Sequence, residues 1–235
     1  AVDDVSFTLQ RGKTLALVGE SGCGKTTLGK ALLHLIPFNG GEVFLDGIAF
    51  HNLSSESLRQ ERAAMQIIFQ DPFSSMNPRL LVGDIIAEGL SALRPEMPAS
   101  EREVRVRKLL KRVELPEEAM YRYPHEFSGG QRQRICIARA LAVEPKVIIC
   151  DEPTSALDVS VQSQIIKLLK TLQEEQGMSY LFITHDLAVV SEIADEVAVM
   201  YRGKIVEQGA VAQILTQPQH AYTQKLLSAI PCAVA

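Results

Sequence analysis

A segment near the start of the chain combines glycines, a lysine and a threonine at the spacing of a phosphate-binding loop. The sequence reads GESGCGKT from Gly19 to Thr26, which matches the pattern G-x-x-x-x-G-K-[ST]. Glycines let the backbone curl so that successive N–H groups face phosphate oxygens, and the helix that follows adds the positive end of its dipole. Lys25 would supply a charge at the β and γ phosphates, and the Thr26 hydroxyl could ligate Mg²⁺. A chance match is expected in about one per hundred chains of this length, so the prediction depends on the flanking strand and helix.

Two adjacent carboxylates, Asp151 and Glu152, follow an apolar run from Val147 to Cys150. If that run is a strand of a parallel sheet, both side chains arrive at its carboxyl edge, where open α/β folds bind ligands. Asp151 would hold Mg²⁺, directly or through a water molecule, and Glu152 would orient and polarise an attacking water. An acidic turn after a strand is common, so the pair predicts a catalytic site only in combination with the phosphate loop.

Gln70 and His185 each follow a further apolar run and would reach the same edge. The Gln70 amide could ligate Mg²⁺ or hold the water, although a glutamine at the end of a strand is ordinarily solvated. A lone histidine after a strand is more often structural than functional. Chemistry alone therefore leaves both interpretations open for both residues.

Residues 128 to 131 read Ser-Gly-Gly-Gln and open a helical stretch, so a serine hydroxyl and bare backbone N–H groups face outward from the positive end of a helix. This would be a second anion site in a chain that already has one. The simpler interpretation is a helix cap with flexible glycines, and it would be favoured if the segment stood alone.

The elements that must position these residues follow from hydrophobic periodicity. Short runs rich in β-branched and apolar residues are typical of buried parallel strands, and longer stretches with helical spacing lie between them. The expected strands are Thr14 to Val18, Gln66 to Phe69, Val147 to Cys150 and Tyr180 to Thr184. The expected helices are Thr26 to Leu35, Glu101 to Val113, Gln131 to Val143 and Val161 to Gln176. This alternation predicts a layered α/β fold with crossover helices.

Three other segments complete the outline. Residues 5 to 10 alternate in polarity and are expected to form a strand, with so little chain before them that the N-terminus looks trimmed. Residues 84 to 145 carry helical patterns punctuated by prolines, so we expect an inserted helical subdomain within an α/β core made of residues 1–83 and 146–235. The pair Arg202-Gly203, between Val197–Met200 and Lys204–Glu207, predicts a hairpin.

Composition excludes several classes of protein. The chain has 235 residues, of which 46% are hydrophobic and 22% are charged, so intrinsic disorder is not expected. No segment approaches the roughly 18 apolar residues that a membrane-spanning helix requires, and a net charge of -4 does not indicate nucleic-acid binding. The four cysteines form no C-x-x-C pair, and no secretory leader is visible, so we expect a reduced, cytoplasmic location and neither a zinc site nor a disulfide framework.

Taken together, these motifs resemble the ATP-binding subunits of ABC transporters, in the order found in that family and over essentially the whole chain. The matching segments are the phosphate loop, Gln70, Phe127 to Gln131, Asp151-Glu152, Ser155 to Asp158, and His185. Phe127 stands where the family usually has leucine, a change from one apolar residue to another. The resemblance implies a phosphate-loop NTPase core with a mainly parallel sheet, an inserted helical subdomain and an antiparallel β portion.

The same resemblance implies that the chain hydrolyses ATP with Mg²⁺ as a head-to-tail dimer, in which Ser128 and Gly130 of one protomer close on the γ-phosphate held by Lys25 of the other. Asp158 would link the two sites. The implied nucleotide-binding residues are Gly19, Glu20, Ser21, Gly22, Cys23, Gly24, Lys25, Thr26, Thr27, Ser128, Gly129, Gly130, Gln131 and Asp158. The implied catalytic residues are Glu152, His185 and Gln70, and the implied metal-binding residues are Thr26, Gln70 and Asp151.

Two segments narrow the resemblance to importers of oligopeptides, dipeptides and nickel. They are Gln70 to Arg79 and His220 to Pro231. Two further segments, Ile85 to Leu90 and Arg122 to Gln131, are most similar to the second ATPase half of fused microcin C and peptide importers. This implies a peripheral position at the cytoplasmic face of the inner membrane, with permease subunits contacted near Gln70–Arg79. The partner ATPase could be identical or a sister domain, and the transported solute stays open.

Two alternative functions remain open, and the sequence departs from the pattern of the family at one position. The alternatives are an ABC-type ATPase that acts on DNA or the ribosome without a membrane partner, and a small phosphotransferase, which would leave Ser128 to Gln131 and Asp158 unexplained. The departure concerns the aromatic residue on which the family stacks adenine, because its position would fall upstream of Ala1 and none of the five tyrosines can be assigned to it. Cys232 alone cannot form the cysteine cluster of some peptide importers, so no iron–sulfur centre is expected.

Overall fold

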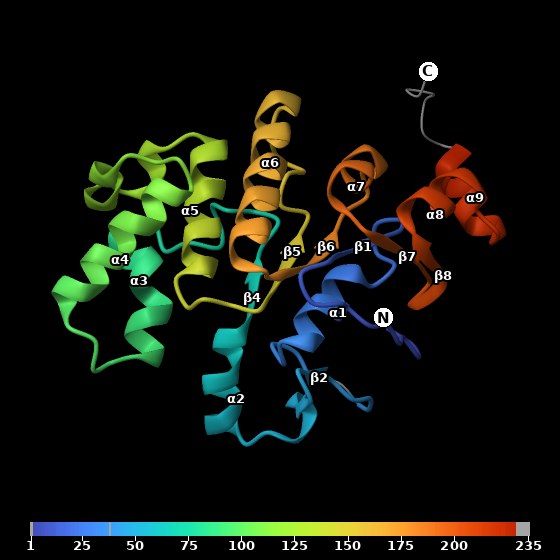
Figure 1. The fold of residues 1–235 in the computed structure, drawn as a ribbon, viewed down its shortest axis with the longest axis horizontal. Coiled ribbons are helices and arrows are strands. Elements are labelled where there is room, and N and C mark those ends of the chain that lie inside the picture. Colours follow the sequence, from blue (N-terminus) through green and yellow to red (C-terminus); the bar gives the residue numbers. More distant parts are fainter. Residues whose placement is uncertain (1, 38, 229–235) are drawn as a thin grey trace.

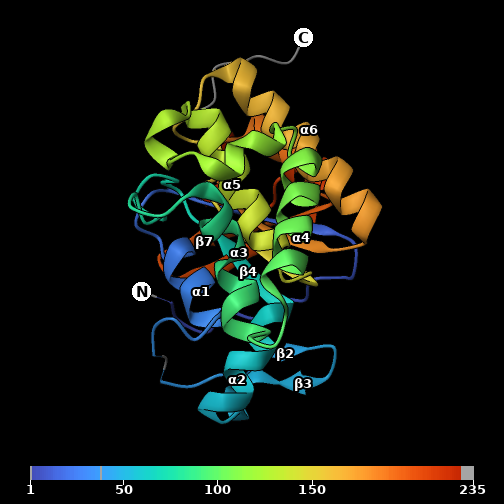
Figure 2. The ribbon, with the colours of Figure 1, turned by 90° about the vertical axis from the view of Figure 1, so that its left-hand side faces the viewer.

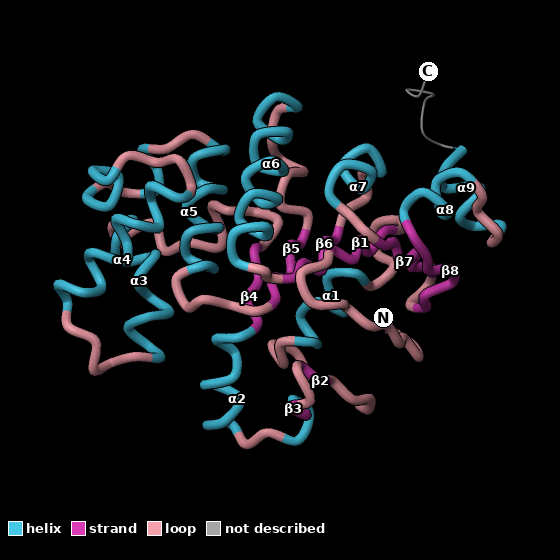
Figure 3. The backbone as a smooth tube through the Cα atoms, in the orientation of Figure 1, coloured by secondary structure: helices cyan, strands magenta, loops and turns pink. Residues whose placement is uncertain are grey.

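The strand that precedes the phosphate loop lies inside a six-stranded sheet with the order β4-β5-β6-β1-β7-β8, drawn in magenta in Figure 3. The computed structural model describes residues 2–37 and 39–228. The strands are β1 Thr14–Val18, β4 Met65–Ile68, β5 Val147–Asp151, β6 Ser179–Ile183, β7 Glu196–Tyr201 and β8 Lys204–Ala210. The first five strands of that order are parallel and β8 is antiparallel to β7. The carboxyl ends of the parallel strands therefore meet at one edge.

Helices cover both faces of this sheet. Figure 1 shows α6 and α7 above it and α1 below it. The helices outside the expected helical subdomain are α1 Lys25–Leu32, α2 Ser55–Glu61, α6 Val159–Gln176, α7 Leu187–Ile193, α8 Val211–Thr216 and α9 Ala221–Ser228. A small antiparallel pair, β2 Phe44–Leu45 and β3 Ile48–Ala49, lies beside α2. Short 3₁₀ helices span Phe50–Asn52, Arg62–Ala64, Glu117–Tyr121 and Pro124–Glu126.

The central strands are continuous apolar runs because both of their faces are buried. In β5, Ile148 and Cys150 join the hydrophobic core on the side of α6, whereas Ile149 joins the core on the side of α1, with Leu28. Successive side chains of a strand point to opposite faces, so a strand covered on both sides needs apolar residues at every position. This explains why the expected strands and the observed ones agree to within one residue or so at their ends.

Three helices form the region that the sequence marks as helical: α3 Val82–Leu93, α4 Ala99–Arg112 and α5 Gly129–Leu141. Residues 84–145 are all described and contain no strand. Figure 2 shows these helices grouped on one side of the sheet. Their core is continuous with it, since Leu90 and Leu110 belong to the same buried cluster as Ile148 of β5. The division at residues 84 and 145 stays a prediction.

One expected strand is wrong. Residues 5 to 10 belong to no strand and have no ladder partner among the described residues, although Val5, Phe7 and Leu9 pack against the core on the α1 side of the sheet. Their alternation therefore reports which side chains are buried, which is a different property from pairing with a neighbouring strand.

The predicted hairpin is confirmed by β7 and β8. Arg202 and Gly203 at its turn both have positive φ, 47° and 86°, as a two-residue type I′ turn requires. The last residues of the segment His220 to Pro231, from Ala229 onward, lie outside the described residues, as do Ala1 and Cys232. No helix in the described ranges has both the length and the apolar character needed to cross a membrane.

Candidate active site

The loop from Gly19 to Gly24 joins the end of β1 at Val18 to the start of α1 at Lys25, as the sequence predicts. Gly22 and Gly24 have φ of 81° and 113°, which L-residues rarely adopt. At Gly19 a Cβ atom would overlap the backbone carbonyl oxygen of Met200 in β7. Glycine is therefore required here both by conformation and by the close approach of a neighbouring strand.

Lys25 is buried, with 5% of its surface exposed, and its ammonium group turns back into the loop. Its Nζ donates hydrogen bonds to the carbonyl oxygens of Gly19 at 2.7 Å and Glu20 at 3.0 Å. The positive charge is therefore held within the loop that the sequence predicts to bind phosphate. Ser21, Gly22 and Cys23 lie in this loop, and Thr26 and Thr27 lie in the first turn of α1.

Thr26 and Asp151 meet at the carboxyl edge of the sheet, where the Thr26 hydroxyl donates to Asp151 Oδ1 at 2.9 Å. Asp151 is the last residue of β5 and is 3% exposed. Burial raises the pKa of its carboxyl group, and the neighbouring charge of Glu152 raises it further, against the opposing hydrogen bond from Thr26. A hydroxyl and a carboxylate side by side are hard oxygen ligands, so the residues present fit a divalent cation such as Mg²⁺.

Gln70, Glu152 and His185 form a second cluster at the same edge. Gln70 Nε2 donates to Glu152 Oε2 at 2.9 Å, and His185 Nδ1 lies 3.1 Å from Glu152 Oε1. The three residues follow β4, β5 and β6, which are neighbours in the sheet, so the strand order accounts for their meeting. The backbone of Glu152 has a φ of 47°, and its N–H donates to the carbonyl oxygen of Ile183 at 2.9 Å.

Ser128 caps α5 in a reciprocal arrangement with Gln131. The Gln131 N–H donates to Ser128 Oγ at 3.4 Å, and the Ser128 N–H donates to Gln131 Oε1 at 3.0 Å. A Cβ atom at Gly130 would press against Val161 of α6, so this glycine also has a packing role. The helix-cap interpretation therefore describes this segment within one chain. Asp158 is the residue before α6, and no capping bond to its side chain is found there.

Within the described part of the chain, no hydrogen bond or ion pair joins residues 128–131 to the phosphate loop. The structure thus brings the predicted site residues together in two groups. Gly19 to Thr27, Gln70, Asp151, Glu152 and His185 share one sheet edge, while Ser128 to Gln131 and Asp158 lie at the ends of α5 and α6.

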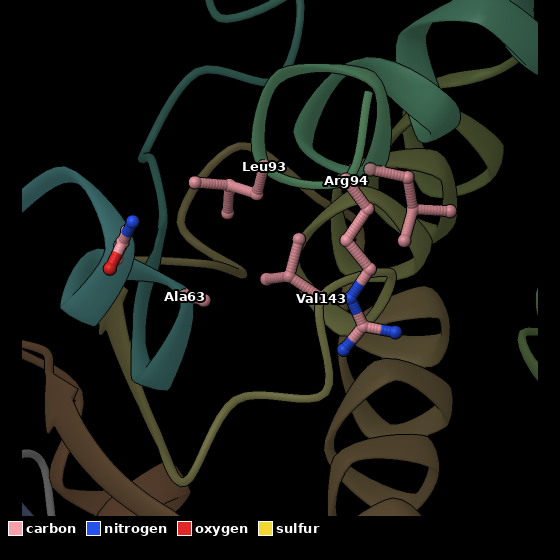
Figure 4. A pocket seen from close by; sticks show the side chains of 6 residues that line it. Ala63, Leu93, Arg94 and Val143 are labelled. Carbon is pink, nitrogen blue, oxygen red and sulfur yellow. The ribbon is translucent and has the colours of Figure 1, made fainter. Parts of the chain in front are cut away.

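A pocket of about 180 Å³ lies apart from both groups (Figure 4). Residues of α2 and its 3₁₀ extension, of α3 and of the turn after α5 line it. They are Gln60, Ala63, Leu90, Leu93, Arg94 and Val143. This lining is mainly apolar and supplies no carboxylate or imidazole, so the pocket has no part in the chemistry of the sheet edge.

Two residues that no sequence motif assigns to the site, Tyr222 and Gly203, contact the phosphate loop. The Glu20 N–H donates to the Tyr222 hydroxyl at 2.9 Å, and the Gly203 N–H donates to the Cys23 carbonyl oxygen at 3.0 Å. Tyr222 belongs to the segment that marked the importer resemblance, and that is the only signal in the sequence that singles it out.

Comparison with known proteins gives concordant results. A family model described as "ABC transporter" matches residues 2–155. The oligopeptide transport ATP-binding protein OppF of Bacillus subtilis is 53% identical over 232 residues, which is 98% of this chain and 76% of that protein. The glutathione import ATP-binding protein GsiA of Pectobacterium atrosepticum is 54% identical over 233 residues, which is 99% of this chain but only 37% of that protein.

Two solved structures resemble most of the fold. The ATP-binding cassette MJ0796, solved as a dimer in a post-hydrolysis state bound to ADP and Pi, superposes with a TM-score of 0.80 at 31% identity, covering 89% of this chain and 90% of that one. CbiO1 of Clostridium perfringens, part of the transporter complex cbiONQ, gives a TM-score of 0.82 at 31% identity, covering 92% and 84%.

Proposed function

Since the chain belongs to the ABC transporter family, we propose that it is the ATP-hydrolysing domain of an importer of peptides or related small solutes. Relatives above 50% identity are named for oligopeptide transport and for glutathione import. Both solutes are peptides, and this supports the peptide class without choosing between them. The chain covers little more than a third of GsiA, so activities of that longer protein are not carried over as a whole.

The observation that carries ATP hydrolysis is the convergence of three polar groups at one sheet edge. They are the Lys25 ammonium in its loop, the Thr26–Asp151 pair, and Glu152 held between Gln70 and His185. Phosphoryl transfer to water passes through a loose transition state that needs little covalent help, so positioning and charge neutralisation account for most of the catalysis.

Thr26, Asp151 and Gln70 are the residues that would hold Mg²⁺, which would neutralise developing phosphate charge. Thr26 and Asp151 already present adjacent oxygens, which supports this assignment. Glu152 has the role of orienting the attacking water and accepting its proton. Gln70 and His185 fix the direction of that carboxylate through its two oxygens.

The second group of residues acts across a dimer. Ser128, Gly129, Gly130 and Gln131 would reach the nucleotide of a partner ATP-binding domain, with Asp158 close to the contact. Their separation from the phosphate loop within one chain supports this arrangement, as does the dimeric state of the similar cassette MJ0796. The Ser128 hydroxyl accepts a capping bond from Gln131 and still has a proton to donate.

Permease subunits are the second partner, and we propose that they contact the segment Gln70–Arg79. Phe73 in this segment is 50% exposed, with the Arg132 guanidinium 5.3 Å from its ring centroid. A large apolar side chain held at the surface suits a protein contact. This contact would place the chain at the cytoplasmic face of the membrane and would connect the permease to Gln70.

The test is reconstitution of the full-length protein with its permease subunits in vesicles, followed by ATP-driven uptake of labelled oligopeptide, glutathione and an unrelated sugar. We expect peptide uptake with release of free phosphate. Uptake of the sugar alone, co-purification with nucleic acid instead of permease, or phosphate transfer to an acceptor would each contradict the proposal.

A further inference from the structure

Helix α9 contacts the phosphate loop through Tyr222, a residue that the proposed function does not use. Tyr222 lies in α9, and its hydroxyl accepts a hydrogen bond of 2.9 Å from the backbone N–H of Glu20. The two residues are 202 positions apart in the chain. Burial raises the pKa of Tyr222 further above physiological pH, where a phenol is already neutral. Figure 1 shows α9 beside α8, at the end of the sheet formed by β7 and β8.

The Glu20 N–H belongs to the same peptide group as the Gly19 carbonyl. That carbonyl accepts a hydrogen bond of 2.7 Å from Lys25 Nζ. The peptide unit between Gly19 and Glu20 is therefore held at both of its polar groups. The Lys25 ammonium binds its carbonyl oxygen, and the Tyr222 phenol binds its N–H group. A rotation of this peptide would break both contacts at once.

The phenol itself is held firmly in place. Its ring stacks on Tyr201 of β7 with 4.2 Å between centroids and an interplanar angle of 29°. The Tyr222 N–H donates to His220 Nδ1 at 3.1 Å. The backbone N–H groups of Gln219 and His220 donate to the Glu207 carboxylate of β8 at 2.7 and 3.0 Å. Tyr222 is 7% exposed, so water does not compete freely for its hydroxyl.

The β7–β8 hairpin supports the same loop directly. The Gly203 N–H donates to the Cys23 carbonyl oxygen at 3.0 Å, and Met200 O lies where a side chain on Gly19 would have to go. The hairpin and α9 together therefore support the phosphate loop from the β7 side of β1, whereas Asp151 and Glu152 come from β5, on the other side of β1 in the strand order.

We propose that Tyr222 is a positioning residue for nucleotide binding: it fixes the Gly19–Glu20 peptide so that the carbonyl facing Lys25, and with it the start of the loop, keeps the conformation that receives phosphate. Preorganisation of this kind improves affinity because the loop loses less freedom when the ligand binds. The inference goes beyond the proposed function, since neither import nor dimerisation enters it.

The test compares Tyr222→Phe with Tyr201→Phe in the full-length protein. Both changes remove one hydroxyl from the same pair of stacked rings, but no hydrogen bond to the Tyr201 hydroxyl exists among the described residues. For Tyr222→Phe we expect the KM for ATP to rise about three- to tenfold, the effect of one net hydrogen bond, with kcat changed less than about twofold. Exchange of the Glu20 amide proton, followed by NMR, should accelerate in the same variant.

Tyr201→Phe should leave the KM and the exchange rate at their wild-type values. An unchanged or lowered KM in Tyr222→Phe, even with a lower Tm, would show that the residue only packs, and it would overturn the proposal. An equal rise of KM in both variants would also overturn it, because the ring stack and not the hydrogen bond would then be responsible. Failure of peptide uptake with an intact KM effect would count against the proposed function and leave this inference standing.

Discussion

Gln70 and Glu152, which lie 82 positions apart in the chain, meet through a hydrogen bond of 2.9 Å between the Gln70 amide and one carboxylate oxygen of Glu152. The other oxygen faces His185 Nδ1 at 3.1 Å. Both residues therefore fix the direction of the same carboxylate. If Gln70 also touches the permease, as we propose, a movement of that contact reaches the carboxylate through a single hydrogen bond.

Replacement of Glu152 tests its assignment to water activation. In Glu152→Gln the amide oxygen can still accept from Gln70, but the negative charge is lost. We expect ATP binding to persist and turnover to fall by about 10²- to 10⁴-fold, the usual range for a positioned acid or base. The variant should also accumulate as an ATP-bound dimer, measurable by light scattering. Exposed Glu118→Gln is the matched control and should hydrolyse ATP normally. Wild-type turnover in Glu152→Gln would remove its assigned role.

The ionised carboxylate of Asp151 should lower the free energy of unfolding at neutral pH in protein that is free of nucleotide and metal. Its pKa is raised mainly by burial, so the folded state binds its proton more tightly than the unfolded state does. The free energy of unfolding therefore falls as the pH rises from the ordinary pKa of aspartate through the raised pKa of Asp151. At a pH below the ordinary pKa, this loss of stability is absent. Asp151→Asn should raise the Tm at pH 7, and the difference from wild type should shrink as the pH falls toward 4.

The same substitution, Asp151→Asn, should weaken ATP hydrolysis although it raises the Tm, because an amide is a poorer Mg²⁺ ligand than a carboxylate. ATPase activity of Asp151→Asn, titrated with Mg²⁺, should need at least about tenfold more metal or be lost. If Asp151→Asn needs the same Mg²⁺ concentration as the wild type, Asp151 does not bind the metal, even if the Tm changes as expected.

Two glycines of the loop should differ in their tolerance of a methyl group. Gly22→Ala meets no atom of the described residues within 4 Å and should cost only the strain of its positive φ, about 1–2 kcal/mol in the free energy of unfolding. Gly19→Ala adds overlap with Met200 O and should cost about 3 kcal/mol or more. Urea unfolding of the two variants gives the comparison. Equal costs would mean that β7 moves away from the loop.

Ser128→Asp separates the helix-cap role from the proposed role at the nucleotide of a partner. Aspartate caps a helix about as well as serine, so the free energy of unfolding should change by less than about 0.5 kcal/mol. A carboxylate facing a partner's γ-phosphate is repelled, and ATPase activity should fall at least about tenfold. Ser54→Asp, at the cap of α2, is the control and should leave activity unchanged. Full ATPase activity in Ser128→Asp would mean that Ser128 acts only as the helix cap of α5.

Local patterns in the sequence are sufficient to predict the features that a few neighbouring residues encode. The loop Gly19–Gly24 was predicted because its glycines and lysine act through local backbone geometry. The strands β1, β5 and β6 were predicted because burial on both faces requires an unbroken apolar run. The hairpin turn at Arg202-Gly203 was predicted because few residue pairs accept its positive φ angles.

Which of these elements are neighbours depends on the packing of the whole chain. The order β4-β5-β6 brings Gln70, Glu152 and His185 together, and no local pattern contains that order. Residues 5 to 10 show what a local pattern leaves undecided, since their polarity alternates but no strand in the described part of the chain pairs with them. Tyr222 reaches Glu20 across 202 positions for the same reason. Periodicity reports the burial of each residue, whereas pairing and contact depend on how the whole chain packs.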